Sequence, residues 1–230
     1  MDDISDEPQK SGADVAYGLV KAAVSSLPVA GGAAAEILSL VFGPPLERRR
    51  EEWLQRLADA VREIQENVAD LTPEKLSQNE AFVSTALRAS EIAVRTHQEE
   101  KLEALRNAVV SAALPDAPDD TLQQIFLNYV DALTPWHLRL LTFFEDPTAW
   151  GAKHGIAYPN WSAGTPASAL EIALPELSGN REFYDQLVTD LQQRGLLRQF
   201  SMHASMTASG IFSPRISPTG KRFLNFISAK

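Results

Sequence analysis

Few residues of this sequence have the types and spacing that catalysis or metal binding requires. The 230 residues include no cysteine, which removes thiol nucleophiles, disulfides, thiolate zinc sites and iron–sulfur clusters together. The sequence also has no HExxH, GxxxxGK(S/T), GxGxxG or GxSxG motif. We therefore expect no enzymatic activity, no metal and no cofactor, although a site assembled from distant residues would leave no such pattern. Four histidines stand apart from one another, at His97, His137, His154 and His203.

One aromatic segment could line a ligand pocket. The stretch from Trp150 to Pro166 is rich in Gly, Pro and aromatic residues, so we expect a loop, and it carries His154, Tyr158 and Trp161 as well as Trp150. Aromatic rings provide stacking surfaces and the histidine provides a titratable group. The same rings could instead pin a long loop onto the core. We favour this second interpretation, because long ordered loops need such anchors.

Basic residues gather toward the C-terminal end, although the chain as a whole is acidic. The sequence contains 21 Lys and Arg against 30 Asp and Glu, a formal charge of −9. Residues 1–135 carry −11 and residues 136–230 carry +2, and positions 191–230 contain no Asp or Glu. This cationic end suits contacts with phosphates or with an acidic partner, and the alternative is an ordinary solvated surface. The candidate contact residues are Arg194, Arg198, Arg215, Lys221 and Arg222.

A second basic group begins at Arg48, where three consecutive arginines follow the Ala- and Gly-rich apolar segment from Val15 to Phe42. This combination could hold a helical hairpin against an anionic membrane surface, as a membrane-active effector would. The structural alternative, which we favour, pairs Arg48 with Glu52 and Arg62 with Glu66 across helical turns. Peripheral membrane contact therefore remains a hypothesis beside the two docking hypotheses developed below.

Residues 1–12 predict an acidic, disordered leader, because they combine several acids with few apolar side chains. A secretory signal would need a basic start followed by an apolar core. The least charged stretch, Val15 to Leu46, is long enough to span a bilayer but is interrupted by Pro28 and by the pair Pro44-Pro45. We therefore expect a cytoplasmic protein.

The elements that must position these residues are mostly helices. Apolar side chains recur at helical spacing over much of 13–133, which predicts a helical bundle. Gly43-Pro44-Pro45 predicts a helix end, and Thr72-Pro73 predicts a helix start with a threonine cap. The capping-box spacing that begins at Thr96 favours a break there, and the acids around Asp119 favour a new helix N-terminus.

The remaining region, 134–230, has a different pattern of predicted elements. Three helical stretches precede an extended segment with several apolar residues, a turn candidate follows at Ser209-Gly210, and a closing helix begins near Ser217. The predicted fold is therefore mainly α, a helical bundle followed by an α+β domain with a small β-hairpin. The predicted helices cover 136–144, 167–177, 180–194 and 217–228, and the predicted strands lie within 196–202 and 211–216.

This order of elements resembles that of winged-helix domains. The resemblance is carried by Leu133-Thr134-Pro135-Trp136-His137-Leu138, by the stretch from Leu187 to Leu197, and by Ile216-Ser217-Pro218-Thr219-Gly220-Lys221-Arg222-Phe223-Leu224. It covers about two-fifths of the chain. The chain as a whole is loosely similar to abortive-infection (alpha-type) and related uncharacterised bacterial proteins. The winged-helix resemblance implies recognition of DNA or protein through the third helix and the wing.

The charge of the third helix distinguishes these two implied functions. Its exposed positions include Glu182, Asp185 and Asp190, and an acidic recognition helix would repel the phosphates that flank a major groove. We therefore favour a bacterial interaction or regulatory protein, with a possible link to defence, that docks a partner protein through its winged-helix-like end. A winged-helix DNA-binding regulator is the alternative, and it would use the same basic residues on phosphates.

Overall fold

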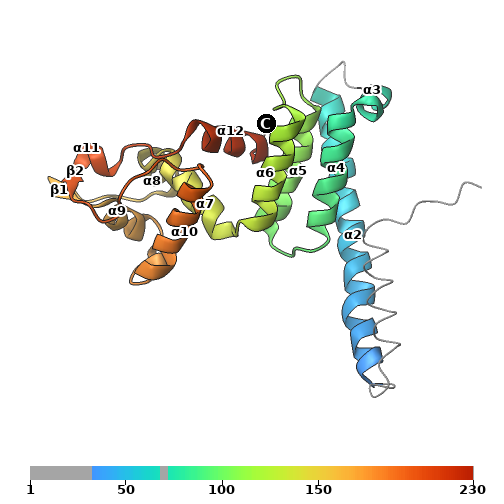
Figure 1. Cartoon of the computed structure of the whole chain (residues 1–230), viewed down its shortest axis with the longest axis horizontal. Helices are drawn as coiled ribbons and strands as arrows, with labels where there is room; N and C mark the ends of the chain where they lie inside the picture. The colour runs from blue at the N-terminus through green and yellow to red at the C-terminus, as the bar shows by residue number, and fades with distance from the viewer. Residues whose placement is uncertain (1–32, 68–71, 230) are drawn as a thin grey trace, which may run out of the picture. The chain divides into compact units, whose positions relative to one another are not determined.

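The structure is a computed structural model that describes residues 33–67 and 72–229, with the side chains of 45–66 and 72–229. Contacts divide the chain into two compact units, 1–97 and 98–230, which we describe one at a time (Figure 1). The expected leader, and the part of the apolar segment before Ala33, lie outside the described residues. Among the helices that the structure does describe, none is both long and apolar enough to cross a membrane.

In the first unit, long helices pack through a buried tryptophan. Trp53 is 2% exposed, and its indole Nε1–H donates to the hydroxyl of Ser90 at 2.8 Å, which joins two helices. The predicted start at Thr72-Pro73 is confirmed, because the Thr72 hydroxyl accepts a hydrogen bond from the backbone N–H of Lys75. The described helices of this unit are α2 (Ala33–Asn67), α3 (Pro73–Gln78) and α4 (Glu80–Ala93).

The predicted helix end at Gly43-Pro44-Pro45 is wrong, since α2 continues through it. Each proline removes one backbone donor, but its fixed φ of about −65° is itself compatible with a helix. The predicted pairing of Arg48 with Glu52 is confirmed at 3.5 Å. Arg62, in contrast, pairs with Asp59 at 2.9 Å rather than with Glu66.

The second unit begins with α5 (Glu99–Ala113) and α6 (Asp120–Ala132), and α12 (Pro218–Ile227) returns to pack against α5 (Figure 1). The predicted break near Thr96 is confirmed, although Gln98 is the residue at the N-cap. The predicted acidic start of α6 is also confirmed, because the Asp119 carboxylate accepts from the N–H of Leu122. An aromatic contact joins α6 to α12, with the Phe126 ring 5.5 Å from that of Phe223.

The middle of the second unit is a layer of short helices. α7 packs against α10 and α8, and α8 packs against α9 (Figure 1). Thr134 and Pro135 start α7 as predicted, and Gly195 follows α10 with a φ of 70°, the left-handed conformation that ends many helices. The bounds are α7 (Pro135–Glu145), α8 (Pro147–His154), α9 (Pro166–Ala173), the 3₁₀ helix η1 (Pro175–Leu177) and α10 (Arg181–Gln193).

The predicted β-hairpin is only partly present. Leu197 and Ile216 form an antiparallel bridge, so the two ends of the predicted hairpin do meet. Between them, however, β2 (Met206–Thr207) pairs with β1 (Ala163–Gly164) rather than with its own neighbour. The predicted turn at Ser209-Gly210 lies inside α11 (Ala208–Ile211). The cause is the earlier segment before α9, which supplies a competing strand edge.

The observed architecture is therefore mainly helical with a small antiparallel sheet, as the sequence predicts in outline. The division between units does not coincide with the predicted boundary at 133/134. α5 and α6 fall in the second unit because α12 packs on α5, and the Asn107 amide donates to the carbonyl of Ile227 at 3.1 Å in a buried position. The second unit thus has its own core, and it contains all the predicted site residues.

Candidate functional site

A cleft of about 840 Å³ opens in the second unit, where the junction of α7 and α8 meets the segment 198–217 and the first turn of α12. Three basic side chains from separate elements line it, namely Lys153, Arg198 and Lys221, and we call it the cationic cleft. Its wall further includes two acids and several apolar side chains: Glu145, Asp146, Trp150, Pro214, Ile216 and Pro218.

Local backbone geometry brings the three cations to this cleft. Lys153 lies in the last turn of α8, which ends at Gly155 with a φ of 67°. Arg198 lies directly after the antiparallel bridge, and its backbone N–H donates to the carbonyl of Arg215 at 2.8 Å. Lys221 lies in the first turn of α12. The cations are therefore held by three different parts of the chain that the fold brings together.

The first turn of α12 adds a further source of positive potential. The Ser217 hydroxyl accepts from the N–H of Gly220 at 2.9 Å, and Pro218 occupies the first helical position. Unpaired N–H groups give a helix N-terminus a partial positive charge, which favours anions nearby. Gly220 is required for the close approach of this turn, because a Cβ there would collide with the backbone carbonyl of Leu196.

The three cations are exposed and available. Among the residues that the structure describes, the side chains of Lys153, Arg198 and Lys221 form no hydrogen bond and no ion pair. No residue in the described ranges therefore holds them in an ion pair. A ligand with an anionic group would gain charge-assisted hydrogen bonds here without first breaking an internal salt bridge.

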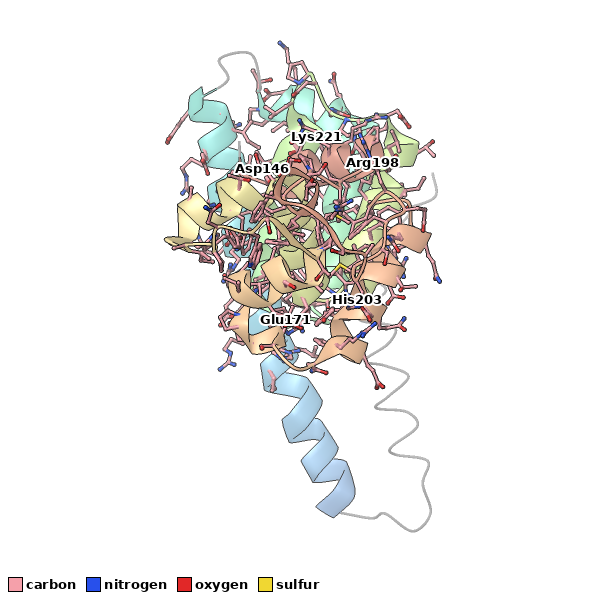
Figure 2. All side chains as sticks on the ribbon, turned by 90° about the vertical axis from the view of Figure 1, so that its left-hand side faces the viewer. Asp146, Glu171, Arg198, His203 and Lys221 are labelled. Carbon is pink, nitrogen blue, oxygen red and sulfur yellow. The ribbon has the colours of Figure 1, made fainter. Side chains whose placement is uncertain are left out.

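Two acids line the same cleft from the junction of α7 and α8. Asp146 caps α8, where its Oδ1 accepts from the N–H groups of Thr148 and Ala149 at 3.0 and 2.9 Å. Figure 2 shows Asp146 and Arg198 on either side of Lys221. The cleft is therefore not uniformly basic: a ligand that extends along it would meet cations at one part and carboxylates at another.

Trp150 and His154 lie on a helix, not in the loop that we predicted. The motif Asp146-Pro147 starts α8, so the predicted loop begins only after Gly155. The rings of Trp150 and His154 stack with centroids 4.1 Å apart, and Trp150 also lines the cationic cleft. The indole Nε1 of Trp150 is shielded from solvent and has no hydrogen-bond acceptor among the described residues.

Tyr158 and Trp161 belong to a different cluster. Both rings pack on Phe212, with centroids 4.8 and 6.0 Å away, and Tyr158 also contacts the α8 backbone where Gly151 leaves room for its ring. Neither residue lines the cationic cleft. Trp150 alone of the aromatic set lines the cleft, while Tyr158 and Trp161 contact Phe212 instead.

Of the remaining predicted basic residues, Arg194 and Arg215 are engaged within the unit. The Arg194 guanidinium lies 5.9 Å from the centre of the Tyr129 ring. Arg215 lies 4.5 Å above the Phe200 ring and donates to the carbonyl of Gly210 at 2.7 Å, and burial lowers the pKa of its guanidinium. Both residues therefore stabilise the unit and do not line the cationic cleft.

Arg222, although it follows Lys221, faces a different cavity. It lines a space of about 240 Å³ with Asp116, Asp119 and Asn225. Two carboxylates share this small cavity with the guanidinium, so the acidic neighbours of Arg222 differ from Glu145 and Asp146, which line the cleft of Lys221. The pair Lys221 and Arg222 thus provides a matched comparison: two exposed cations on one helix turn, of which one lines the cationic cleft.

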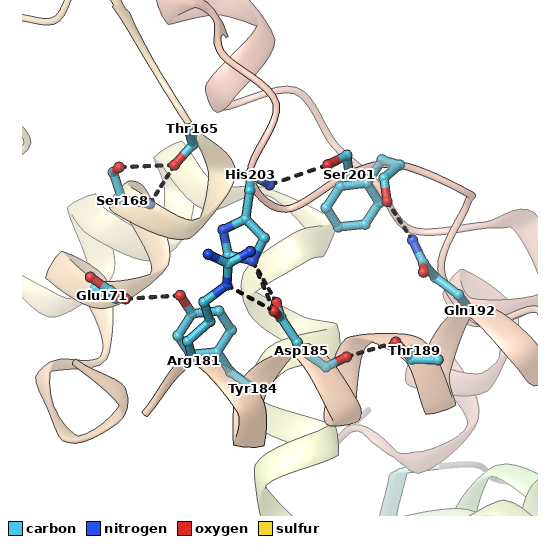
Figure 3. A network of polar contacts seen from close by, with 11 residues as sticks. Thr165, Ser168, Glu171, Arg181, Tyr184, Asp185, Thr189, Gln192, Ser201 and His203 are labelled. Carbon is cyan, nitrogen blue, oxygen red and sulfur yellow. Dashed lines mark hydrogen bonds and ion pairs between the residues drawn. The ribbon is translucent and has the colours of Figure 1, made fainter. Parts of the chain in front are cut away.

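A polar network joins α10 to the segment that carries Arg198 (Figure 3). Nε2 of His203 lies 2.8 and 2.9 Å from the two carboxylate oxygens of Asp185, which also accepts from Nε of Arg181 at 3.3 Å. Next to it, the Tyr184 hydroxyl donates to Glu171 at 2.9 Å. Burial, together with this neighbouring carboxylate, raises the pKa of Tyr184 to about 12.

Another histidine stabilises the start of α7. Nδ1 of His137 accepts from the backbone N–H of Thr134 at 3.1 Å, so the proton of the neutral ring resides on Nε2, which lies 3.4 Å from Asp190. Burial lowers the pKa of His137, although the hydrogen bond to Asp190 opposes this effect. His137 completes a capping box, and we assign it a structural role.

The sequence reasoning missed Lys153, Glu145 and Asp146 as neighbours of Arg198 and Lys221. The motif Asp146-Pro147 was a signal that could have predicted α8, and a helix of that length would have placed Lys153 one turn beyond Trp150. Across the described ranges, no cluster of His, Asp and Glu could hold a metal ion. Comparisons with protein-family models, curated proteins and solved structures find no match for this chain.

Proposed function

We propose that residues 98–230 form a non-enzymatic docking module that binds a partner protein through the cationic cleft. The observation that carries this proposal is that Lys153, Arg198 and Lys221 come from three elements and line one concave surface, with no counter-charge bound to them among the described residues. Cations that share a cleft can act together on one anionic group, which scattered surface cations do not do. A role in bacterial defence remains an extension of this proposal that rests on the resemblance alone.

The proposal includes a winged-helix-like arrangement of residues 134–230. It is supported by the order of α7, α9 and α10, then the bridge between Leu197 and Ile216, then α12, with α8 as an additional helix between α7 and α9. The segment between the two bridged residues would be the wing. It departs from a simple wing because it contains α11 and because β2, within it, pairs with β1.

Acidic side chains favour a protein partner over duplex DNA. In a winged helix α10 would enter the major groove, yet it exposes Glu182 and carries Asp185 and Asp190. Glu145 and Asp146 also line the cleft beside the cations. A duplex presents an unbroken row of phosphates, which these carboxylates would repel, whereas a partner protein can place one anionic group beside the cations.

Site-specific crosslinking in cells tests the docking proposal. A photo-reactive side chain at Thr219, which is exposed beside Lys221, should give one discrete protein adduct, and the double substitution Arg198→Gln with Lys221→Gln should reduce its yield several-fold. The matched control places the same group at Asn225, exposed further along α12. Equal yields at both positions, or a yield that the double substitution leaves unchanged, would contradict the proposal.

DNA binding is the second candidate, because phosphates would use the same cations. It predicts an affinity for duplex DNA that falls steeply as salt rises, and that Lys221→Gln weakens. Titration of a labelled duplex, followed by fluorescence anisotropy, measures both effects. Absence of binding at low salt removes this candidate and leaves the docking proposal intact.

A further inference from the structure

The charges of the cationic cleft are arranged for a compact anion. Arg198 and Lys221 line it together with the positive N-terminal end of α12, whereas Glu145 and Asp146 enter from the junction of α7 and α8. Counting Lys153, three cations and two carboxylates share the wall, so the whole cleft has little net charge. An extended acidic tract would meet both signs, and its attraction to the cations would be offset by repulsion from the carboxylates.

A phosphomonoester concentrates more charge on one group than a carboxylate does. It carries about −1.5 to −2 charges at pH 7 on three acceptor oxygens, whereas a carboxylate carries one charge on two oxygens. The guanidinium of Arg198 offers a planar set of donors that matches a phosphate in two parallel hydrogen bonds, and the ammonium of Lys221 adds a rotatable donor. Such a group concentrates its charge over a shorter length of the cleft than an extended acidic tract does.

The rest of the cleft suits the organic part that carries the phosphate. Trp150, Pro214, Ile216 and Pro218 provide apolar wall, and the volume of about 840 Å³ exceeds what a bare phosphate would fill. Cavities of roughly 300–1,000 Å³ with mostly apolar walls and a few polar groups are typical of sites for small organic ligands. The wall therefore favours a phosphate attached to a side chain over free phosphate.

We infer that the partner segment that docks in the cationic cleft carries a phosphorylated side chain. This inference rests on the proposed function and specifies its anionic group. Arg198 and Lys221 bind the phosphate, Lys153 contributes to the attraction, and the apolar wall contacts the carbon atoms that bear it. Glu145 and Asp146 exclude polyanions, which makes docking dependent on phosphorylation at one residue.

Three labelled peptide pools test the inference on the full-length protein. The pools share randomised flanks and differ at the central residue, which is phosphoserine, glutamate or serine. We expect the phosphoserine pool to bind roughly tenfold more tightly than the glutamate pool, measured by fluorescence anisotropy. Arg198→Gln and Lys221→Gln should each remove most of this advantage, and Arg222→Gln, on the same turn of α12, should preserve it.

The location of binding is measured separately through Trp150. Its indole N–H gives its own nuclear magnetic resonance signal, and the phosphoserine pool should shift that signal, while thermal unfolding confirms that each variant is folded. Equal binding of the phosphoserine and glutamate pools, both lost in Arg198→Gln, would overturn the phosphate inference but keep the docking proposal. Binding that neither Arg198→Gln nor Lys221→Gln weakens would overturn both. Tighter binding of duplex DNA than of any pool would favour the DNA alternative and overturn the inference.

Discussion

Gly220 lies where α12 approaches Leu196, in the segment that follows α10, and its missing side chain permits that approach. A Cβ at this position would collide with the Leu196 carbonyl and would lie 2.8 Å from Cγ1 of Ile216. Alanine has a higher intrinsic helix propensity than glycine, by up to about 1 kcal/mol, so propensity and packing make opposite predictions for Gly220→Ala. We expect packing to dominate and the free energy of unfolding to fall by about 1–3 kcal/mol.

Chemical denaturation of Gly220→Ala measures this effect directly. Thr219→Ala is the matched control, because Thr219 is the exposed neighbour in the same turn and should change the free energy of unfolding little. A Gly220→Ala protein as stable as the parent would show that the close approach relaxes at no cost.

His137 makes the stability of the second unit depend on pH. Burial lowers the pKa of the folded imidazole below its ordinary value of 6.5, so the unfolded chain binds a proton more readily. The free energy of unfolding should therefore fall as the pH decreases from 6.5 to the folded pKa, and the contribution of His137 is fully present above 6.5. The Asp190 carboxylate reduces the size of this effect because it favours the charged ring.

The variant His137→Gln isolates that contribution. Glutamine can still accept the capping hydrogen bond from Thr134 but does not titrate. The difference in unfolding free energy between parent and variant, measured by denaturation across this pH range, should shrink at lower pH. A constant difference would mean that the buried ring does not control this pH dependence.

Residue types alone identified Arg198, Lys221 and Trp150 but not their proximity. The first two belong to the predicted basic set and Trp150 to the predicted aromatic loop, and both sets meet in one cleft. A sequence position does not reveal whether its cation is available, since Arg215 stacks on Phe200 while Arg198, whose backbone N–H donates to the Arg215 carbonyl, is exposed. Such differences depend on long-range packing, which leaves no local pattern.

At the scale of elements, Gln192 holds the segment that carries Arg198 to α10. Its Nε2 donates to the carbonyls of Arg198 and Phe200 at 3.2 and 3.0 Å. Gln192→Ala should increase amide hydrogen exchange across residues 198–206 roughly fivefold, as expected from the loss of about 1 kcal/mol of hydrogen bonding. Gln193→Ala is the control, because Gln193 is exposed. Equal exchange in the two variants would assign the segment's order to other contacts, such as that between His203 and Asp185.

Helix starts were more predictable than the β-structure. A cap is a local device, so Thr72, Asp119 and Ser217 each indicate a helix start within a few residues, and each side chain accepts the capping hydrogen bond in the structure. The predicted hairpin failed in its middle because strand pairing is non-local. There, Met206 and Thr207 pair with a segment some forty residues earlier in the chain.

At the scale of the whole molecule, the change in texture at Thr134-Pro135 predicted a domain boundary that contacts place elsewhere. α12 buries Phe223 and Phe226 against the Phe126 ring of α6, and α5 donates to its last turn through Asn107. Proline and threonine mark the start of α7 but carry no information about which helices share a core. The compact unit that contains α12 therefore begins near Gln98.

Two fragments test whether the folding unit begins near Gln98 or at residue 134. Residues 98–230 retain α5 and α6, which both contact α12, and the ion pair between Glu100 and Arg139 at 2.7 Å. We therefore expect this fragment to unfold cooperatively and to give a dispersed amide spectrum. Residues 134–230 would expose the buried aromatic face of α12, and a domain of that size cannot spare so much of its core. We expect that shorter fragment to lack a cooperative transition in calorimetry. Cooperative unfolding of 134–230 at the temperature of 98–230 would show instead that α5 and α6 are accessory to a domain that folds without them.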